Sequence, residues 1–173
     1  MRITGGELSS LRIPTRFASH VRPSTDRVRE SLFNSLQNQG LIEGAHVLDL
    51  FAGSGIMSAE FVSRGASEVT ALDRDGKNIA NLKELKAMHP LLSTLQIVKG
   101  DVWKWSPEQS FDLIFADPPY DMPGIQSLPD RLLPWLKPGG KLLIEHKPQV
   151  QFAQPTEQTR TYGSTTITIF VQA

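Results

Sequence analysis

The fold is decided by the stretch Val47-Leu48-Asp49-Leu50-Phe51-Ala52-Gly53-Ser54-Gly55. Residues 46–51 are mostly apolar, which is typical of a strand buried on both faces of a sheet. Glycines follow at once, and residues 54–64 then have the pattern of a helix that Gly65 ends. A buried strand that turns on glycines into a helix begins a β–α–β unit, so the stretch predicts a parallel sheet.

The same alternation of strand and helix continues along the chain. Strands are predicted at residues 68–72, 95–98, 111–116 and 141–145, and helices at residues 75–88 and 125–135, the last leading into a Pro138-Gly139-Gly140 turn. Two final strands, at residues 159–162 and 165–171, flank only Gly163-Ser164, which predicts an antiparallel hairpin. We therefore expect an open α/β sheet, mainly parallel, with an antiparallel edge.

The N-terminal residues follow a different pattern. Residues 2–4 and 11–13 alternate polar and apolar side chains around Gly5-Gly6, which predicts a short hairpin. Thr25 or Asp26 can cap a helix that runs to about Asn38. A length of 173 residues fits one domain. We expect residues 1–40 to form a basic hairpin, loop and helix, and residues 45–173 to form the core that binds a cofactor.

The composition limits the class of protein. The chain has 18 basic and 18 acidic residues, 39% hydrophobic residues and no cysteine. No apolar run approaches the roughly 18 residues of a membrane helix, and the N-terminus lacks a secretory pattern. The four histidines have no metal-ligand spacing. We therefore expect a cytoplasmic protein that contacts no membrane and binds no metal.

Arginine is concentrated near the N-terminus. Residues 1–30 carry six arginines and no lysine against three acidic residues. The planar guanidinium suits phosphate and stacks on bases, so this choice is typical of a nucleic-acid contact. A basic arm packed on acidic groups of its own domain has the same composition, and both interpretations stay open.

The loop after the first strand has the features of a nucleoside site. Gly53 and Gly55 let the backbone turn sharply and approach a ligand. In open α/β sheets, ligands bind beyond the carboxyl ends of the strands, where this loop lies. The next strand ends at Asp73, 24 residues after Asp49, where a carboxylate can accept hydrogen bonds from both ribose hydroxyls.

Two further residues bear on the choice of nucleotide. A dinucleotide fingerprint would have a third glycine at Ser58, and the Asp49 carboxylate would repel a pyrophosphate but suit the ammonium of a methionine moiety. This favours S-adenosylmethionine over NAD, with glycines kept for packing as the alternative. Asp101 either accepts from the adenine amino group or caps the segment that begins at Val102. The candidate cofactor-binding residues are Asp49, Phe51, Gly53, Gly55, Asp73 and Asp101.

The strand at residues 111–116 ends in Asp117-Pro118-Pro119-Tyr120. The exocyclic amine of a base is a poor nucleophile, because its lone pair is delocalised into the ring. Two acceptors on its protons, the Asp117 carboxylate and the Pro118 carbonyl, can localise that lone pair. Pro119 has no N–H to compete, and Tyr120 offers a ring for a base taken out of its stack. A structural turn is the alternative, but the place at a strand tip favours catalysis.

These loops together resemble the class I S-adenosylmethionine-dependent amino methyltransferases. The family is narrowed by Arg22-Pro23-Ser24-Thr25-Asp26-Arg27-Val28-Arg29-Glu30-Ser31-Leu32-Phe33-Asn34 and by Tyr162-Gly163-Ser164-Thr165. Over essentially the whole chain, the sequence resembles the RsmD family, bacterial enzymes that methylate the 2-amino group of one guanine in 16S ribosomal RNA. The resemblance implies a Rossmann-like sheet of seven strands, with Arg22, Arg27 and Arg29 near the RNA.

The resemblance implies 16S ribosomal RNA as the partner, free or within a small ribosomal subunit or assembly intermediate, and we expect a monomer. One departure is Glu7-Leu8-Ser9-Ser10, where the family hairpin is usually strongly basic. The alternatives are an amino methyltransferase acting on DNA adenine or protein glutamine, and a non-catalytic RNA-binding module. The short chain leaves no room for a DNA-recognition region, glutamine methylation favours Asn at Asp117, and a module would have lost the Asp-Pro-Pro-Tyr loop.

Overall fold

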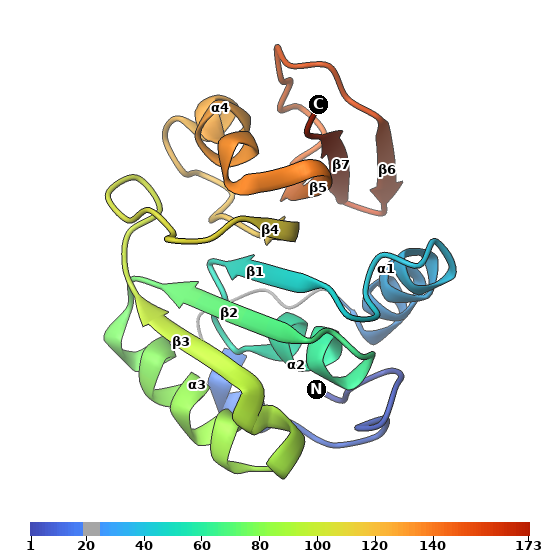
Figure 1. Cartoon of the computed structure of the whole chain (residues 1–173), viewed down its shortest axis with the longest axis vertical. Coiled ribbons are helices and arrows are strands. Elements are labelled where there is room, and N and C mark those ends of the chain that lie inside the picture. The colour runs from blue at the N-terminus through green and yellow to red at the C-terminus, as the bar shows by residue number, and fades with distance from the viewer. Residues whose placement is uncertain (19–24) are drawn as a thin grey trace.

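The protein is built around one seven-stranded sheet (Figure 1). The computed structural model describes residues 1–18 and 25–173. The strands are β1 (His46–Leu50), β2 (Glu68–Asp73), β3 (Leu95–Lys99), β4 (Phe111–Ala116), β5 (Leu136–His146), β6 (Gln158–Tyr162) and β7 (Thr165–Val171). The strand order is β3-β2-β1-β4-β5-β7-β6. Strands β1 to β5 are parallel, and β7 is antiparallel to β5 and β6, which confirms the predicted sheet and its C-terminal hairpin.

The helices connect these strands and cover the sheet. The α-helices are α1 (Asp26–Asn38), α2 (Ile56–Ser63), α3 (Gly76–Ala87) and α4 (Leu128–Leu132), and the 3-10 turns are η1 (Thr15–Ala18), η2 (Pro90–Thr94), η3 (Ile125–Ser127) and η4 (Leu133–Trp135). Thr25 caps α1 by accepting a hydrogen bond from the Val28 amide, as predicted. Within the described residues, no helix is long and apolar enough to span a membrane.

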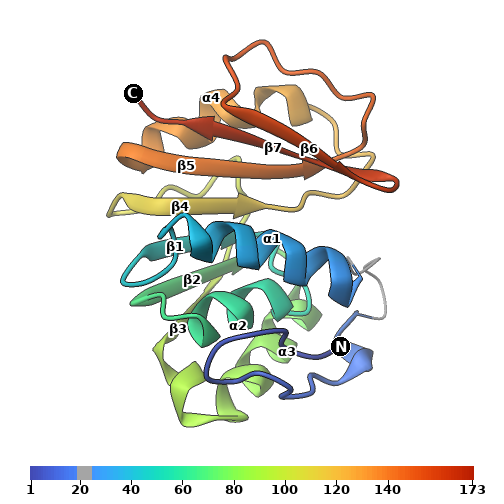
Figure 2. The same cartoon turned by 90° about the vertical axis from the view of Figure 1, so that its right-hand side faces the viewer.

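The core lies on both faces of the sheet, because successive strand residues point to opposite sides. Val47 and Phe115 belong to one buried cluster, with apolar residues of the N-terminal segment and of α1, α2 and α3. Leu48 and Ile114 belong to the other, which residues 125–136 cover. Figure 2 shows α1 and α2 on one side of the strands and α4 on the other.

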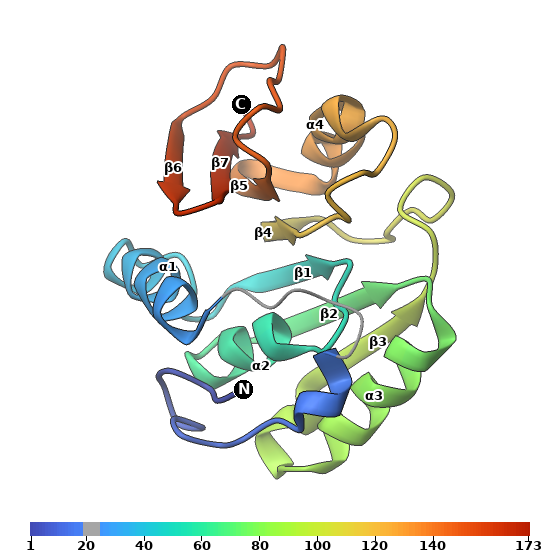
Figure 3. The same ribbon diagram turned by 180° about the vertical axis from the view of Figure 1, so that it is seen from behind.

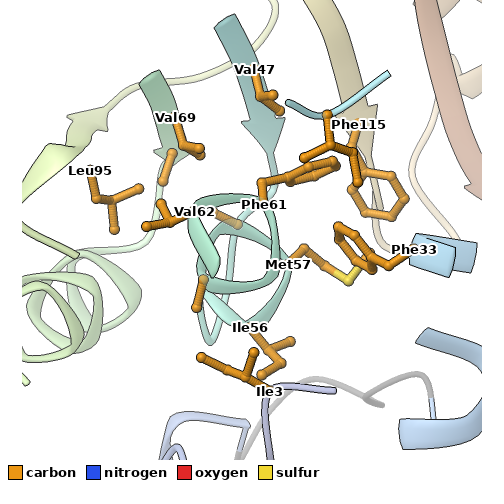
Figure 4. Packing of buried hydrophobic residues seen from close by; sticks show 14 of the residues in the cluster. Ile3, Phe33, Val47, Ile56, Met57, Phe61, Val62, Val69, Leu95 and Phe115 are labelled. Carbon is orange, nitrogen blue, oxygen red and sulfur yellow. The ribbon is translucent and has the colours of Figure 1, made fainter. Parts of the chain in front are cut away.

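Helix α2 is buried along its whole length between the sheet and the N-terminal segment. In the close view of Figure 4, Val47 and Phe115 lie on the strands beside Phe61 and Met57 of α2. The Phe61 ring meets Phe33 of α1 edge-to-face, with ring centroids 4.7 Å apart. Burial on every side explains why this helix has no polar face in the sequence.

Three predicted elements differ from the structure. The helix expected at residues 125–135 is divided into η3, α4 and η4, because Pro129 and Pro134 lack the amide protons that a continuous helix requires. The Pro138-Gly139-Gly140 turn lies inside β5, as an irregularity where the pairing with β4 shifts register. The N-terminal hairpin is reduced to one antiparallel bridge between Arg2 and Arg12.

The N-terminal segment docks on the last turn of α2. The amides of Glu7 and Leu8 donate to the carbonyl and side chain of Ser63, at 2.8 and 2.9 Å. A Cβ on Gly6 would lie 1.9 Å from the Ser63 carbonyl oxygen, so only glycine allows this approach. Helix α2 runs from the carboxyl ends of the strands toward their amino ends. The segment at residues 6–8, which contacts the end of α2, therefore lies near the amino ends of the strands.

The C-terminal hairpin of β6 and β7 forms the edge of the sheet beyond β5. It lies beside α1 (Figure 3), where Arg160 of β6 donates to the Ser35 hydroxyl of α1 at 2.8 Å. At the centre of the sheet, β1 and β4 are neighbours, but the chain continues from β1 to β2 on one side and from β4 to β5 on the other side. The loops after β1 and β4 therefore diverge, and an opening forms between them at the carboxyl ends, where open α/β sheets bind ligands.

Candidate active site

A cavity of about 870 Å³ opens at the carboxyl ends of β1 to β4. Eight of the ten residues predicted for catalysis and cofactor binding line it, from four separate loops: Phe51, Gly53, Asp73, Asp101, Asp117, Pro118, Pro119 and Tyr120. Asp49 and Gly55 do not line it. The cavity is of the size that small-molecule ligands occupy in proteins.

Asp73 holds the first loop against the second strand. Its Oδ2 accepts hydrogen bonds from the Gly53 amide at 2.9 Å and from the Asn78 side chain at 3.2 Å, and its Oδ1 accepts from the Asp75 amide at 2.9 Å. A carboxylate has about four acceptor sites, so one remains for a ligand hydroxyl, and a second would become free if the Asn78 amide moved away. Asp73 thus shapes the cavity and faces it.

The backbone of the first loop is held in an uncommon conformation. Phe51 has a φ of 59° and Gly53 a φ of 53°, both in the left-handed region. This region is ordinary for glycine but costs free energy for phenylalanine, and such residues are frequent at binding sites. The conformation lets both residues line the cavity.

The structure gives Gly55 a different role from the predicted cofactor contact. Its φ is 78°, and a Cβ there would lie 2.5 Å from Leu85 and 2.7 Å from Leu82, both on α3. Its lack of a side chain therefore makes room for helix packing. The packing interpretation of this glycine is the one that the structure supports.

Asp49 lies behind the cavity, where it is only 1% exposed. Its Oδ2 accepts a hydrogen bond from the Ser58 hydroxyl. Burial, together with the nearby Asp73 carboxylate, raises the pKa of Asp49 to about 7 against the lowering effect of the Ser58 hydrogen bond. Asp49 can therefore act on a ligand through its charge, and the described structure gives it no direct contact with the cavity.

The cavity wall after β3 contains Asp101, which was predicted, and Trp103, which was not. Asp101 Oδ1 accepts from the Trp103 amide at 2.8 Å, so it caps the turn that follows while it lines the cavity. Trp103 also lines the cavity and is 39% exposed, which is unusual for a large hydrophobic residue. Its place two residues after Asp101 was the signal available in the sequence.

Two further lining residues follow β2. Arg74 and Asn78 both face the cavity from the start of α3, and Asn78 reaches Asp73 as described above. Neither belongs to a motif that the sequence analysis used. Their positions one and five residues after the strand-end carboxylate were the only signal.

Asp117 begins the loop after β4, and its amide donates to the Leu50 carbonyl at 3.5 Å, which joins the tips of β4 and β1. Burial raises its pKa well above the usual range, and the carboxylates of Glu145 and Asp49 raise it further. Glu145 is the penultimate residue of β5 and accepts from the Thr165 hydroxyl at 3.0 Å. A third acid, from the neighbouring strand, therefore acts on Asp117, and no motif in the sequence indicates it.

The predicted RNA-binding arginines lie in different environments. Arg22 lies outside the described residues. Arg27 is exposed on the first turn of α1. Arg29 is 1% exposed, and its guanidinium donates to Glu60 at 3.2 Å, to Asp26 at 2.6 Å and to the Arg2 carbonyl at 2.8 Å. The prediction that Arg29 contacts RNA is wrong for this conformation, because its donors face inward.

Comparison with known proteins agrees with this architecture. The model of the family described as "Conserved hypothetical protein 95" matches residues 1–171. The chain belongs to this family. It is the RsmD family that the sequence resembled, and curated members carry the name Ribosomal RNA small subunit methyltransferase D. One from Haemophilus influenzae is 32% identical over 96% of this chain and 89% of its own, and one from Buchnera aphidicola is 31% identical over 85% and 76%.

Solved structures show the same fold. A provisionally named methyltransferase, yhhF from Escherichia coli, superposes with a TM-score of 0.84 at 25% identity and covers 99% of this chain and 97% of its own. A hypothetical protein from Thermus thermophilus gives a TM-score of 0.82 at 27% identity, with 98% of each chain covered. The fold is that of the class I methyltransferases.

The charged residues that line the cavity are compatible with S-adenosylmethionine. Asp73 and Asp101 line one part of it and Asp117 another, while Arg74 is a basic lining residue. The electropositive sulfonium suits a wall of carboxyl groups, which would disfavour a pyrophosphate. Within the described residues, no group of three His, Cys, Asp or Glu side chains could hold a metal ion.

Proposed function

We propose that this protein transfers the methyl group of S-adenosylmethionine to the 2-amino group of a guanine in 16S ribosomal RNA. The observation that carries the proposal is that Asp73 and the loop Asp117-Pro118-Pro119-Tyr120 line the same cavity. Asp73 is the carboxylate expected to bind the ribose, and the loop is expected to bind the amine of the base. The names of the curated relatives, which refer to the ribosomal RNA of the small subunit, support the choice of substrate.

Asp73, Asp101 and Gly53 would hold the nucleoside part of the cofactor. When bound, S-adenosylmethionine supplies an electrophilic methyl group. Asp73 has an acceptor position left for a ribose hydroxyl, and Asp101 lies where the adenine amino group can donate to it. Asp49, behind the loop, would stabilise the positive charge of the methionine part through the electrostatic field.

Asp117 and the Pro118 carbonyl would hold the amine of the base. Each would accept a hydrogen bond from one N–H of the amine, which localises the nitrogen lone pair toward the methyl group. As the N–C bond forms and the C–S bond breaks, the nitrogen becomes cationic and releases a proton. Asp117 can accept this proton and pass it to water. Its raised pKa makes it a better proton acceptor than an ordinary carboxylate.

The hydrogen-bonding edge of guanine favours it over adenine. Guanine presents its 2-amino group beside an N1–H donor, so an ionised carboxylate can accept from both. Adenine presents its 6-amino group beside the N1 acceptor, which repels the second carboxylate oxygen. Asp117 as an ionised group therefore matches the guanine edge.

The test is transfer of a deuterium-labelled methyl group by the purified protein. Substrates would be unmethylated 16S ribosomal RNA, small subunits from cells without the gene, an adenine-containing DNA duplex and a glutamine peptide. After digestion, mass spectrometry should find the label in N2-methylguanosine. Label in N6-methyladenine or in glutamine would overturn the guanine assignment. Cofactor binding without labelling of any substrate would favour the non-catalytic RNA-binding module.

A further inference from the structure

Lys147 lies over the ring of Tyr120, with its Nζ 5.5 Å from the ring centroid. This distance is within the range of a cation–π interaction. Tyr120 lines the cavity, whereas Lys147 does not. The lysine therefore occupies the neighbourhood of the ring from outside the cavity.

The backbone of Lys147 is firmly held. Its carbonyl accepts from Nδ1 of His146 at 2.7 Å and from the Val150 amide at 3.1 Å. The other ring nitrogen of His146 lies 2.7 Å from the Thr168 hydroxyl, and the ring packs against Phe152. Because Nδ1 must donate to the carbonyl, Nε2 accepts from Thr168. Burial lowers the pKa of His146, which keeps this neutral form.

The Lys147 side chain, in contrast, is exposed. Two lysines of β5, Lys137 and Lys141, form ion pairs with Asp112 and Glu157, whereas Lys147 follows the end of this strand. Among the side chains that the structure describes, Lys147 has no ion-pair partner within 4.0 Å. The backbone of Lys147 is fixed, and its ammonium lies beside the Tyr120 ring on which the base is expected to stack. This arrangement suits an anionic group of the substrate.

We propose that Lys147 is a substrate-positioning residue that binds a backbone phosphate of the RNA strand carrying the target base. This inference rests on the proposed function. The ammonium covers one face of the Tyr120 ring, so the base stacks on the other face, and the phosphate next to that base lies within reach of the lysine. The chain has no net charge to attract RNA, so an attraction to phosphate depends on individual exposed cations such as Lys147.

The alternative anion is the carboxylate of the cofactor. Lys147 lies outside the cavity lining, which favours the RNA phosphate. A contact with the cofactor would change the affinity for S-adenosylmethionine, whereas a phosphate contact would not. The two therefore separate in one set of measurements.

The test compares Lys147→Met and Lys147→Arg with Lys137→Met, which removes the same charge from the other end of β5. The affinity for a 16S-derived RNA is measured at several salt concentrations. In Lys147→Met, the loss of one phosphate contact should make the fall of log affinity with log salt less steep by about 0.7 and weaken binding severalfold. Lys147→Arg should restore both, and Lys137→Met should match the parent.

Kinetics should show a raised KM for RNA in Lys147→Met, with kcat nearly unchanged and the affinity for S-adenosylmethionine unaltered. An unchanged salt slope in Lys147→Met, with an active parent, would overturn this inference alone. A loss of cofactor affinity would assign the lysine to the cofactor and would also overturn it. A parent that transfers no methyl group to RNA would overturn the proposed function, and this inference with it.

Discussion

Arg29 Nε donates to Glu60 Oε1 at 3.2 Å, and neither side chain is exposed to solvent. Glu60 also accepts from Arg64 and from both the amide and the hydroxyl of Thr4. One buried carboxylate therefore ties α1, α2 and the N-terminal segment together. Arg29, which the sequence alone suggested as an RNA contact, serves the fold here.

Replacing Arg29 should destabilise the protein. Arg29→Met removes one partner of a buried ion pair and should lower the free energy of unfolding by about 3 kcal/mol. Arg27→Met, at the neighbouring exposed position, should change it by less than about 0.5 kcal/mol. Urea unfolding monitored by circular dichroism measures both. Equal stability of the two variants would contradict the structural role of Arg29.

Replacing Asp73 should weaken cofactor binding. Asp73→Asn keeps the shape of the side chain but loses charged hydrogen bonds to the Gly53 loop and to the ribose, each contributing about 1.5–3 kcal/mol. The affinity for S-adenosylmethionine should fall by about ten- to a hundredfold, since about 1.4 kcal/mol corresponds to tenfold. Titration calorimetry gives the constants, with Asp130→Asn on α4 as control. Parent-like binding would remove Asp73 from the cofactor site.

Replacing Asp117 should separate chemistry from cofactor binding. Asp117→Ala removes an acceptor of the amine, and loss of one preorganised group of this kind costs about a hundred- to a thousandfold in rate. The affinity for S-adenosylmethionine should change little, because the expected ribose contact, Asp73, comes from another strand. Single-turnover rates with 16S RNA and calorimetry provide the two readouts. A variant that keeps its rate would rule out the proposed role.

The rate of methyl transfer should depend on pH through Asp117. Its pKa is raised by burial and by Glu145, so the ionised acceptor form is lost as the pH falls through that raised value. Glu145→Gln removes a neighbouring negative charge and lowers the pKa of Asp117. The acidic limb of the pH–rate profile should then move to lower pH, while Glu157→Gln leaves it in place. An unmoved limb in Glu145→Gln would show that the two acids are not coupled in the reaction.

The buried Asp49 should make stability fall with rising pH. Its pKa is 3.8 in the unfolded reference and about 7 in the fold, so the native state holds the extra proton in between. Its favourable contribution is complete below about pH 4 and is lost as the pH rises through about 7. At pH 8, the free energy of unfolding of Asp49→Asn should therefore exceed that of the parent by up to about 4 kcal/mol, since one pKa unit corresponds to about 1.4 kcal/mol.

Urea unfolding of Asp49→Asn and the parent at pH 5 and pH 8 measures this difference. Ser58→Ala, which removes the hydrogen bond to Asp49, is the matched control and should destabilise the ionised carboxylate further. If the Asn variant gains no more stability at pH 8 than at pH 5, the raised pKa is wrong.

The fold could be read from the chain because its signals are local. Apolar runs of strand length alternate with helical segments, and the glycines and prolines between them mark the turns. The same locality located Asp73, Asp101 and Asp117, since each stands at or shortly after the end of a predicted strand. Parallel strands bring such residues to one edge, so their proximity followed from the topology.

Other features depend on partners distant in sequence. Nothing near Arg29 shows that Glu60, 31 residues later, encloses its guanidinium. The packing role of Gly55 depends on Leu82 and Leu85 of α3. Glu145 reaches Asp117 only because β5 pairs with β4, which no motif records. Side-chain environment, rather than element order, is what the sequence left open.

The most direct test of the account is a crystal structure with S-adenosylmethionine bound. We expect the ribose on Asp73, the adenine beside Asp101 and the transferable methyl group directed at the loop Asp117-Pro118-Pro119-Tyr120, with space for a base on Tyr120. A cofactor bound outside this cavity, or one whose methyl group is directed away from Asp117, would contradict it.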